Sequence, residues 1–144
     1  VITDHINLMP NPLIGPNIAE LGPRFPDMHN CYDKELIAKA TAIAEEENIK
    51  LQYGVYVGGT GPTFETQAEY RYFKNIGGDA AGMSTVPEAI AAAHCGYEIL
   101  GVTLCANMAA GVLPQPLSGE EVNEMAEQSA PHFSSLILGC LERL

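Results

Sequence analysis

Apolar residues in this chain fall into short continuous runs that alternate with stretches of helical spacing. The runs predict β-strands, because a buried strand is short, apolar and bounded by turn residues. Predicted strands occupy residues 1–7, 55–57, 79–83 and 99–106. The run at 99–106 is continuously apolar, which is typical of a strand covered on both faces.

Between these runs, apolar residues recur every three or four positions behind a polar residue that can cap a helix. The predicted N-caps are Asp33, Thr66, Thr85 and Ser118, and the last three are followed by a glutamate in capping-box spacing. The predicted buried face of the second helix is Ala68, Tyr72, Phe73 and Ile76. In the last helix, which Pro131 should kink, the predicted stripe is Val122, Met125, Ala126, Phe133, Ile137, Cys140, Leu141 and Leu144.

Strand and helix therefore alternate four times, which predicts an α/β layered fold with a largely parallel central sheet flanked by helices. Residues 9–27 are rich in proline and glycine and predict a long irregular connection. Ligands of such folds bind at the carboxyl ends of the strands. The polar and small residues at 4–7, 58–65, 82–84 and 107–111 follow those ends and compose a candidate site.

Charge and composition restrict the partners. The chain has 144 residues, 7 Lys and Arg against 18 Asp and Glu, and a net charge of −11, which disfavours nucleic acid and anionic membranes. No apolar run reaches the roughly 18–20 residues of a membrane span. Three of the four cysteines lie in apolar surroundings, typical of buried reduced thiols, and none has zinc-ligand spacing. We expect a cytoplasmic protein without a metal site.

Three strand ends carry candidate chemistry, each with a structural alternative. Glu65 and the neighbouring Phe64 offer a carboxylate and an aromatic face that suit a flat heterocycle with an N–H group. The structural alternative is that the Glu65 carboxylate interacts favourably with the dipole of the following helix. Ser84 precedes a helix N-terminus that can hold an anion, although N-capping explains this region equally. Asn107 opens a small-residue loop and is otherwise a turn residue. Histidine at position 5 is expected to be a hydrogen-bonded structural residue.

Several motifs resemble the trimeric type of purine nucleoside phosphorylase. They are the segments 4–8, 11–13, 15–17 and 24–33, Gly61-Pro62-Thr63-Phe64-Glu65-Thr66, and Gly82-Met83-Ser84-Thr85-Val86-Pro87-Glu88. The resemblance covers the whole chain, and the motifs agree in order and spacing. It implies that residues 1–144 are the C-terminal half of a single phosphorylase domain whose N-terminal half, with its phosphate loop, is absent.

The resemblance also implies roles. Glu65 would accept from the purine N1–H, Asn107 would bind N7 and the 6-oxygen, and Phe64 would pack on the base. Tyr56 and Met83 would line the ribose, Gly82 would bring backbone to the base, and Ser84 would hold phosphate. The implied reaction is phosphorolysis of inosine or guanosine to purine base and ribose 1-phosphate, in a homotrimer, with inorganic phosphate as co-substrate and no cofactor.

Two alternatives remain open. Methylthioadenosine phosphorylases are related, but they carry an Asp where this chain has Asn107 and an Arg-Phe-Ser-Thr run at 63–66, so the 6-oxopurine interpretation is favoured. A purine-binding fragment without catalysis is the other alternative. Gly119 stands where many members have a ribose-contacting His, and the loop at residues 9–10 is shorter than usual.

Overall fold

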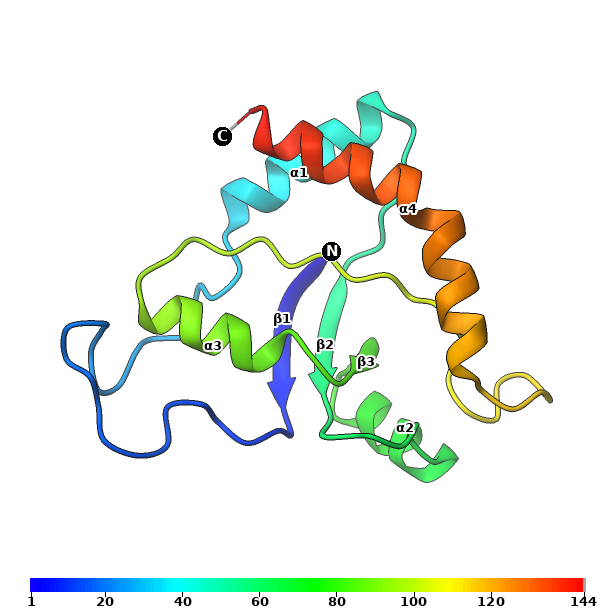
Figure 1. Cartoon of the computed structure of the whole chain (residues 1–144), viewed down its shortest axis with the longest axis horizontal. Helices are drawn as coiled ribbons and strands as arrows, with labels where there is room; N and C mark the ends of the chain where they lie inside the picture. Colours follow the sequence, from blue (N-terminus) through cyan, green and yellow to red (C-terminus); the bar gives the residue numbers. More distant parts are fainter. Residues whose placement is uncertain (144) are drawn as a thin grey trace.

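In the computed structural model, which describes residues 1–143, a parallel three-stranded sheet lies at the centre of the fold (Figure 1). The strands are β1 Ile2–Asn7, β2 Gly54–Gly58 and β3 Ala80–Gly82, in the order β1-β2-β3. The register pairs Asn7 with Gly58 and Gly58 with Gly82, so the three carboxyl ends lie level. The predicted α/β fold with a parallel sheet is confirmed.

The helices begin where the sequence places their caps. They are α1 Lys34–Glu46, α2 Gln67–Asn75, α3 Val86–His94 and α4 Gly119–Leu141. The Asp33 side chain accepts from two backbone N–H groups of the first turn of α1, both at 2.8 Å. Thr66 and Glu69 form both halves of a capping box at α2, and Ser118 accepts from the Glu121 N–H at 3.1 Å at α4. Each cap satisfies backbone donors that have no partner inside the helix.

Two apolar clusters hold these elements together. One lies between α3, β1 and β2 and contains Ile2, Cys31, Tyr32, Tyr56, Val86, Ala89 and Ile90. The other lies between α1 and α4 and contains Ala40, Ile43, Ala44, Leu136 and Cys140. Figure 1 places α1 and the second half of α4 beyond the amino ends of the strands and α2 beyond their carboxyl ends. The carboxyl edge of the sheet is therefore left to α2 and the connecting segments.

The predicted fourth strand at 99–106 is wrong. Within the described residues the segment is extended but makes one antiparallel bridge, between Ile2 and Gly101, through a 2.8 Å hydrogen bond. Leu104 is 36% exposed and Cys105 is exposed, so the run is not covered on both faces. Apolar composition predicts burial, but a strand also needs a hydrogen-bonded neighbour along its length. Within residues 1–143 the run has a β-bridge only at Gly101, and the Ile99 carbonyl accepts from the Asp33 N–H at 2.8 Å.

The predicted buried face of α2 is also largely wrong. Phe73 is buried, but Tyr72 is 52% exposed, Ile76 is 38% exposed and Ala68 is exposed. Tyr70, which the prediction omitted, is partly buried and packs edge-on against Phe73 at 6.2 Å between ring centroids. Because α2 lies beyond the strand ends instead of across a sheet face (Figure 1), only a narrow side of it is covered.

In α4 the predicted stripe overstates what is buried. Leu136, which the stripe omits, is the most covered residue at 2% exposure, whereas Phe133 and Leu141 are 37% and 60% exposed. Leu144 lies outside the described residues. Only the second half of α4 packs on α1, and the helix, which contains Pro131, changes direction along its length (Figure 1). A Glu46–Arg143 ion pair and a Ser135–Glu47 hydrogen bond also join α1, α4 and the residues that directly follow them.

The cysteine and histidine predictions had mixed outcomes. Cys31 and Cys140 are buried, but Cys95 and Cys105 are exposed, so the expectation of three buried thiols is wrong; all four are free. His5 is a structural residue as predicted, because its Nδ1 lies 3.0 Å from the Tyr32 hydroxyl. No helix within residues 1–143 is both long and apolar enough to cross a membrane.

Candidate active site

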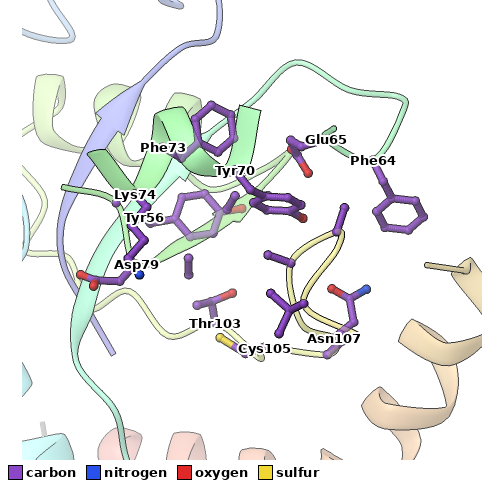
Figure 2. A pocket seen from close by; sticks show the side chains of 18 of the residues that line it. Tyr56, Phe64, Glu65, Tyr70, Phe73, Lys74, Asp79, Thr103, Cys105 and Asn107 are labelled. Atoms are coloured by element: carbon purple, nitrogen blue, oxygen red, sulfur yellow. The ribbon is translucent and has the colours of Figure 1, made fainter. Parts of the chain in front are cut away.

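A pocket of about 690 Å³ opens at the carboxyl edge of the sheet (Figure 2). Its walls come from β2, β3, α2 and the segment around residues 103–112. All seven of the predicted site residues line it: Tyr56, Phe64, Glu65, Gly82, Met83, Ser84 and Asn107. The level strand ends explain this convergence, because each chain segment leaves the sheet at the same edge.

Tyr56 and Gly82 form the floor of the pocket. Tyr56 is 4% exposed, and its hydroxyl lies over the Gly82 backbone so closely that a Cβ on Gly82 would come within 2.1 Å of it. Glycine is therefore required at position 82 by the tyrosine above it. The same hydroxyl reaches the pocket, where it can meet a ligand.

Phe64 and Glu65 lie on one side of the pocket, in the segment that joins β2 to α2 (Figure 2). Phe64 is 39% exposed and Glu65 is partly buried. The alternative that Glu65 favours the dipole of α2 from its first turn does not hold, because Glu65 precedes the N-cap Thr66 and the acidic residue of the first turn is Glu69, which accepts the Thr66 N–H at 2.7 Å. That backbone hydrogen bond holds the pKa of Glu69 below its ordinary value. The Glu65 carboxylate takes no part in the capping box and can bind a ligand in the pocket.

Ser84 precedes α3 at the end of β3. Its hydroxyl lies 3.2 Å from that of Thr85, and Glu88 accepts the Thr85 N–H at 2.7 Å. Thr85 itself has φ +70°, a conformation that costs a β-branched residue about 1–3 kcal/mol and is found mostly where the surroundings enforce it. The strained residue Thr85 thus connects the pocket residues Met83 and Ser84 to the N-terminus of α3.

Asn107 lies across the pocket from Phe64 and Glu65 (Figure 2). It follows the extended segment that the sequence predicted as a buried strand, and Thr103, Leu104 and Cys105 of that segment line the pocket too. These three side chains are therefore accessible from the pocket. The sequence did not predict that these residues line the pocket, because an apolar run does not show which of its side chains stay exposed.

Sequence reasoning missed further lining residues on α2, among them Tyr70, Arg71 and Lys74. Burial raises the pKa of Tyr70 to about 12, and the nearby charge of Glu65 adds to the shift. Arg71 and Lys74 are exposed and bring positive charge to the rim. Within residues 1–143, no three His, Cys, Asp or Glu side chains gather as a metal site would require.

Comparison with known proteins agrees with this geometry. Purine nucleoside phosphorylase 1 of Bacillus subtilis is 53% identical over 138 residues, which cover 95% of this chain and 51% of the relative. The Bos taurus purine nucleoside phosphorylase is 42% identical over 154 residues, covering 98% of this chain and 53% of the relative. The chain thus spans about half the length of the curated relatives it matches.

Solved structures extend the likeness to the backbone. A Schistosoma mansoni purine nucleoside phosphorylase in complex with adenosine matches with a TM-score of 0.95 at 37% identity, covering 99% of this chain and 54% of that one. A schistosome purine nucleoside phosphorylase in complex with hypoxanthine matches with the same TM-score at 36% identity, over 99% of this chain and 54% of that one. The resemblance seen in the motifs is confirmed, and since the phosphorylase superfamily model matches residues 1–142, the chain belongs to that superfamily.

Proposed function

We propose that the protein containing this chain catalyses phosphorolysis of 6-oxopurine nucleosides, releasing purine base and ribose 1-phosphate. The observation that carries the proposal is the gathering of an aromatic face, a carboxylate and an amide, Phe64, Glu65 and Asn107, around one pocket at the strand ends. The chain is proposed to be half of a single phosphorylase domain, in line with the share of its relatives that it covers.

In this proposal the base lies against Phe64. Glu65 accepts the purine N1–H, and the Asn107 amide donates to the purine N7 and 6-oxygen side. Negative charge develops on the purine as its glycosidic bond breaks, so a donor held at that edge stabilises the transition state more than the ground state. Tyr56 and Met83 line the ribose, and Gly82 brings backbone close to the base.

Inorganic phosphate is the proposed co-substrate, and the reaction needs no cofactor because phosphate itself is the nucleophile. Ser84 is the proposed phosphate contact, since its hydroxyl lies at the start of α3, where backbone N–H groups favour an anion. Arg71 and Lys74 at the rim attract anions toward the pocket in a chain whose net charge is −11.

The test measures hypoxanthine release from inosine, with and without phosphate, by the polypeptide as its gene encodes it. We expect release only with phosphate, and a loss of about 100-fold in Glu65→Gln. Release that does not depend on phosphate would indicate a hydrolase. Binding of hypoxanthine with no turnover would indicate a purine-binding protein and contradict the proposed catalysis.

Base preference gives a second test, through Asn107→Asp. A carboxylate can accept from a 6-amino group but cannot donate to a 6-oxygen. We expect inosine cleavage to fall about 100-fold, the scale of losing one transition-state donor, while the rate with adenosine rises relative to inosine. The matched control is Asn123→Asp, an exposed asparagine of α4 outside the pocket. An unchanged ratio between the two nucleosides would exclude Asn107 as the selector.

We also propose a homotrimer in the cytoplasm. Support for self-association comes from the irregular segment between β1 and α1, where Ile14 and Phe25 are 81% and 86% exposed and Ile18 and Leu21 are also exposed. Exposed apolar groups of this kind are typical of interfaces. The four free cysteines suit a reducing compartment. Sedimentation equilibrium tests the assembly, and a monomeric mass at micromolar concentration would contradict it.

A further inference from the structure

Helix α2 brings a tyrosine onto the carboxylate that faces the pocket. Thr66 is the N-cap of α2, so Glu65 stands one residue before the cap and Tyr70 is the fourth residue of the helix. In many helices these two positions hold apolar side chains that pack together across the first turn, because helical side chains lean back toward the N-terminus. Here the same two positions hold a carboxylate and a phenol.

The local structure fixes this pair. The Thr66–Glu69 capping box sets the angle at which the chain enters α2, and the Tyr70 N–H donates to the Thr66 carbonyl at 3.1 Å. The Tyr70 ring packs edge-on against the buried Phe73, 6.2 Å between centroids. Figure 2 shows the polar ends of Tyr70 and Glu65 close to one another at the pocket wall, which both residues line.

We propose that Tyr70 is a positioning residue for Glu65: its hydroxyl donates a hydrogen bond to the carboxylate and holds the remaining acceptor sites toward the N1–H of a 6-oxopurine. This inference rests on the proposed function. Support comes from the raised pKa of Tyr70, to which burial and then the Glu65 carboxylate contribute. A carboxylate offers about four acceptor sites, so one can be given to Tyr70 while the others serve the ligand.

The consequence is selectivity for purines that carry an N1–H. A carboxylate that is already oriented loses less side-chain freedom when the base binds, and each side chain held in advance is worth about 0.5–1.5 kcal/mol of affinity. By the relation of tenfold to 1.4 kcal/mol, this corresponds to about 2- to 10-fold in the dissociation constant. A ligand that does not use Glu65 gains nothing from Tyr70.

The experiment compares Tyr70→Phe with the unchanged protein, using hypoxanthine and 1-methylhypoxanthine as ligands in equilibrium titrations. Phenylalanine keeps the ring that packs on Phe73 and removes only the donor. We expect hypoxanthine to bind about 2- to 10-fold more weakly, and 1-methylhypoxanthine, which lacks N1–H, to bind as before. The matched control is Tyr72→Phe, a tyrosine of the same helix that is 52% exposed and outside the pocket lining; it should change neither affinity.

A double-mutant cycle with Glu65→Gln separates this proposal from the proposed function. If Tyr70 acts through Glu65, then Tyr70→Phe should have no further effect on hypoxanthine binding once Glu65 is glutamine. Equal weakening of both ligands, or an undiminished effect in the Glu65→Gln background, would overturn the positioning role and leave the proposed function standing. Failure of the unchanged protein to bind hypoxanthine would overturn both.

Discussion

Replacing Gly82 by alanine tests whether the pocket floor is built as described. An added Cβ would lie 2.1 Å from the Tyr56 hydroxyl oxygen and 3.0 Å from the ring carbon Cζ that bears it. Contacts of ordinary van der Waals length exceed both distances, so the hydroxyl has to retreat by about 1 Å. The ring cannot easily follow, because Tyr56 is 4% exposed and packs within the cluster that contains Val86 and Ile90.

The magnitude follows from this geometry. Overpacking a well-filled core by one methyl group costs about 1–3 kcal/mol, and we expect Gly82→Ala to lower the free energy of unfolding by that amount. In a Tyr56→Phe background the oxygen is gone and the nearest atom is Cζ at 3.0 Å. Only a few tenths of an ångström are then needed, so the same substitution should cost less than about 1 kcal/mol.

Urea denaturation of the two single variants and the double variant, followed by circular dichroism, measures both costs. The difference between them is the coupling free energy of the Tyr56 hydroxyl with position 82. An equal cost in both backgrounds would refute the contact, since the clash would then involve other atoms. The affinity for hypoxanthine, measured by titration, should also be lower in Gly82→Ala, because the displaced Tyr56 hydroxyl enters the pocket.

Three further predictions concern the remainder of the fold. Leu136→Ala should lower the free energy of unfolding by about 2–5 kcal/mol in urea, because Leu136 is 2% exposed between α1 and α4; the control Leu138→Ala, 59% exposed, should cost far less. Thr85→Gly relieves φ +70° and should be neutral or stabilising by about 1 kcal/mol in the same assay; a clear loss would mean that the Thr85 side chain makes a larger contribution than its strain. Burial lowers the pKa of His5, against the opposing charge of Asp4, so the unfolded state takes up the proton first and stability should fall as the pH drops through about 6.5, the ordinary histidine pKa; His5→Gln should flatten that slope, and an unchanged slope would exclude His5 as its source.

The sequence predicted what depends on neighbouring residues. Helix starts at Asp33, Thr66 and Ser118 follow from side-chain groups within three positions of the cap, and these are confirmed. The convergence of the site also followed from sequence, because parallel strands deliver their following residues to one edge. Cap residues were sufficient to predict the helix starts, and the order of strands and helices was sufficient to predict that the site residues converge.

Predictions that depended on distant packing failed. The run at 99–106 is as apolar as a buried strand, but within the described residues only Gly101 has a bridging partner there. The spacing in α2 marked Tyr72 as buried, whereas Tyr70 lies on the covered side. Periodicity states that a helix has an apolar face, but it does not state which neighbour covers that face or how much of it.

The Tyr56–Gly82 contact connects these two kinds of information. In the parallel register Tyr56 lies opposite Ala80, and Gly82 is the next residue of β3 on the same face of the sheet. A slip of one residue would turn Gly82 to the other face and place a side chain under the tyrosine hydroxyl. The glycine therefore favours the observed strand register and shapes the pocket floor together, since this pairing leaves space for the hydroxyl. Met83 and Ser84 follow Gly82 directly, so the same contact determines where both residues enter the pocket.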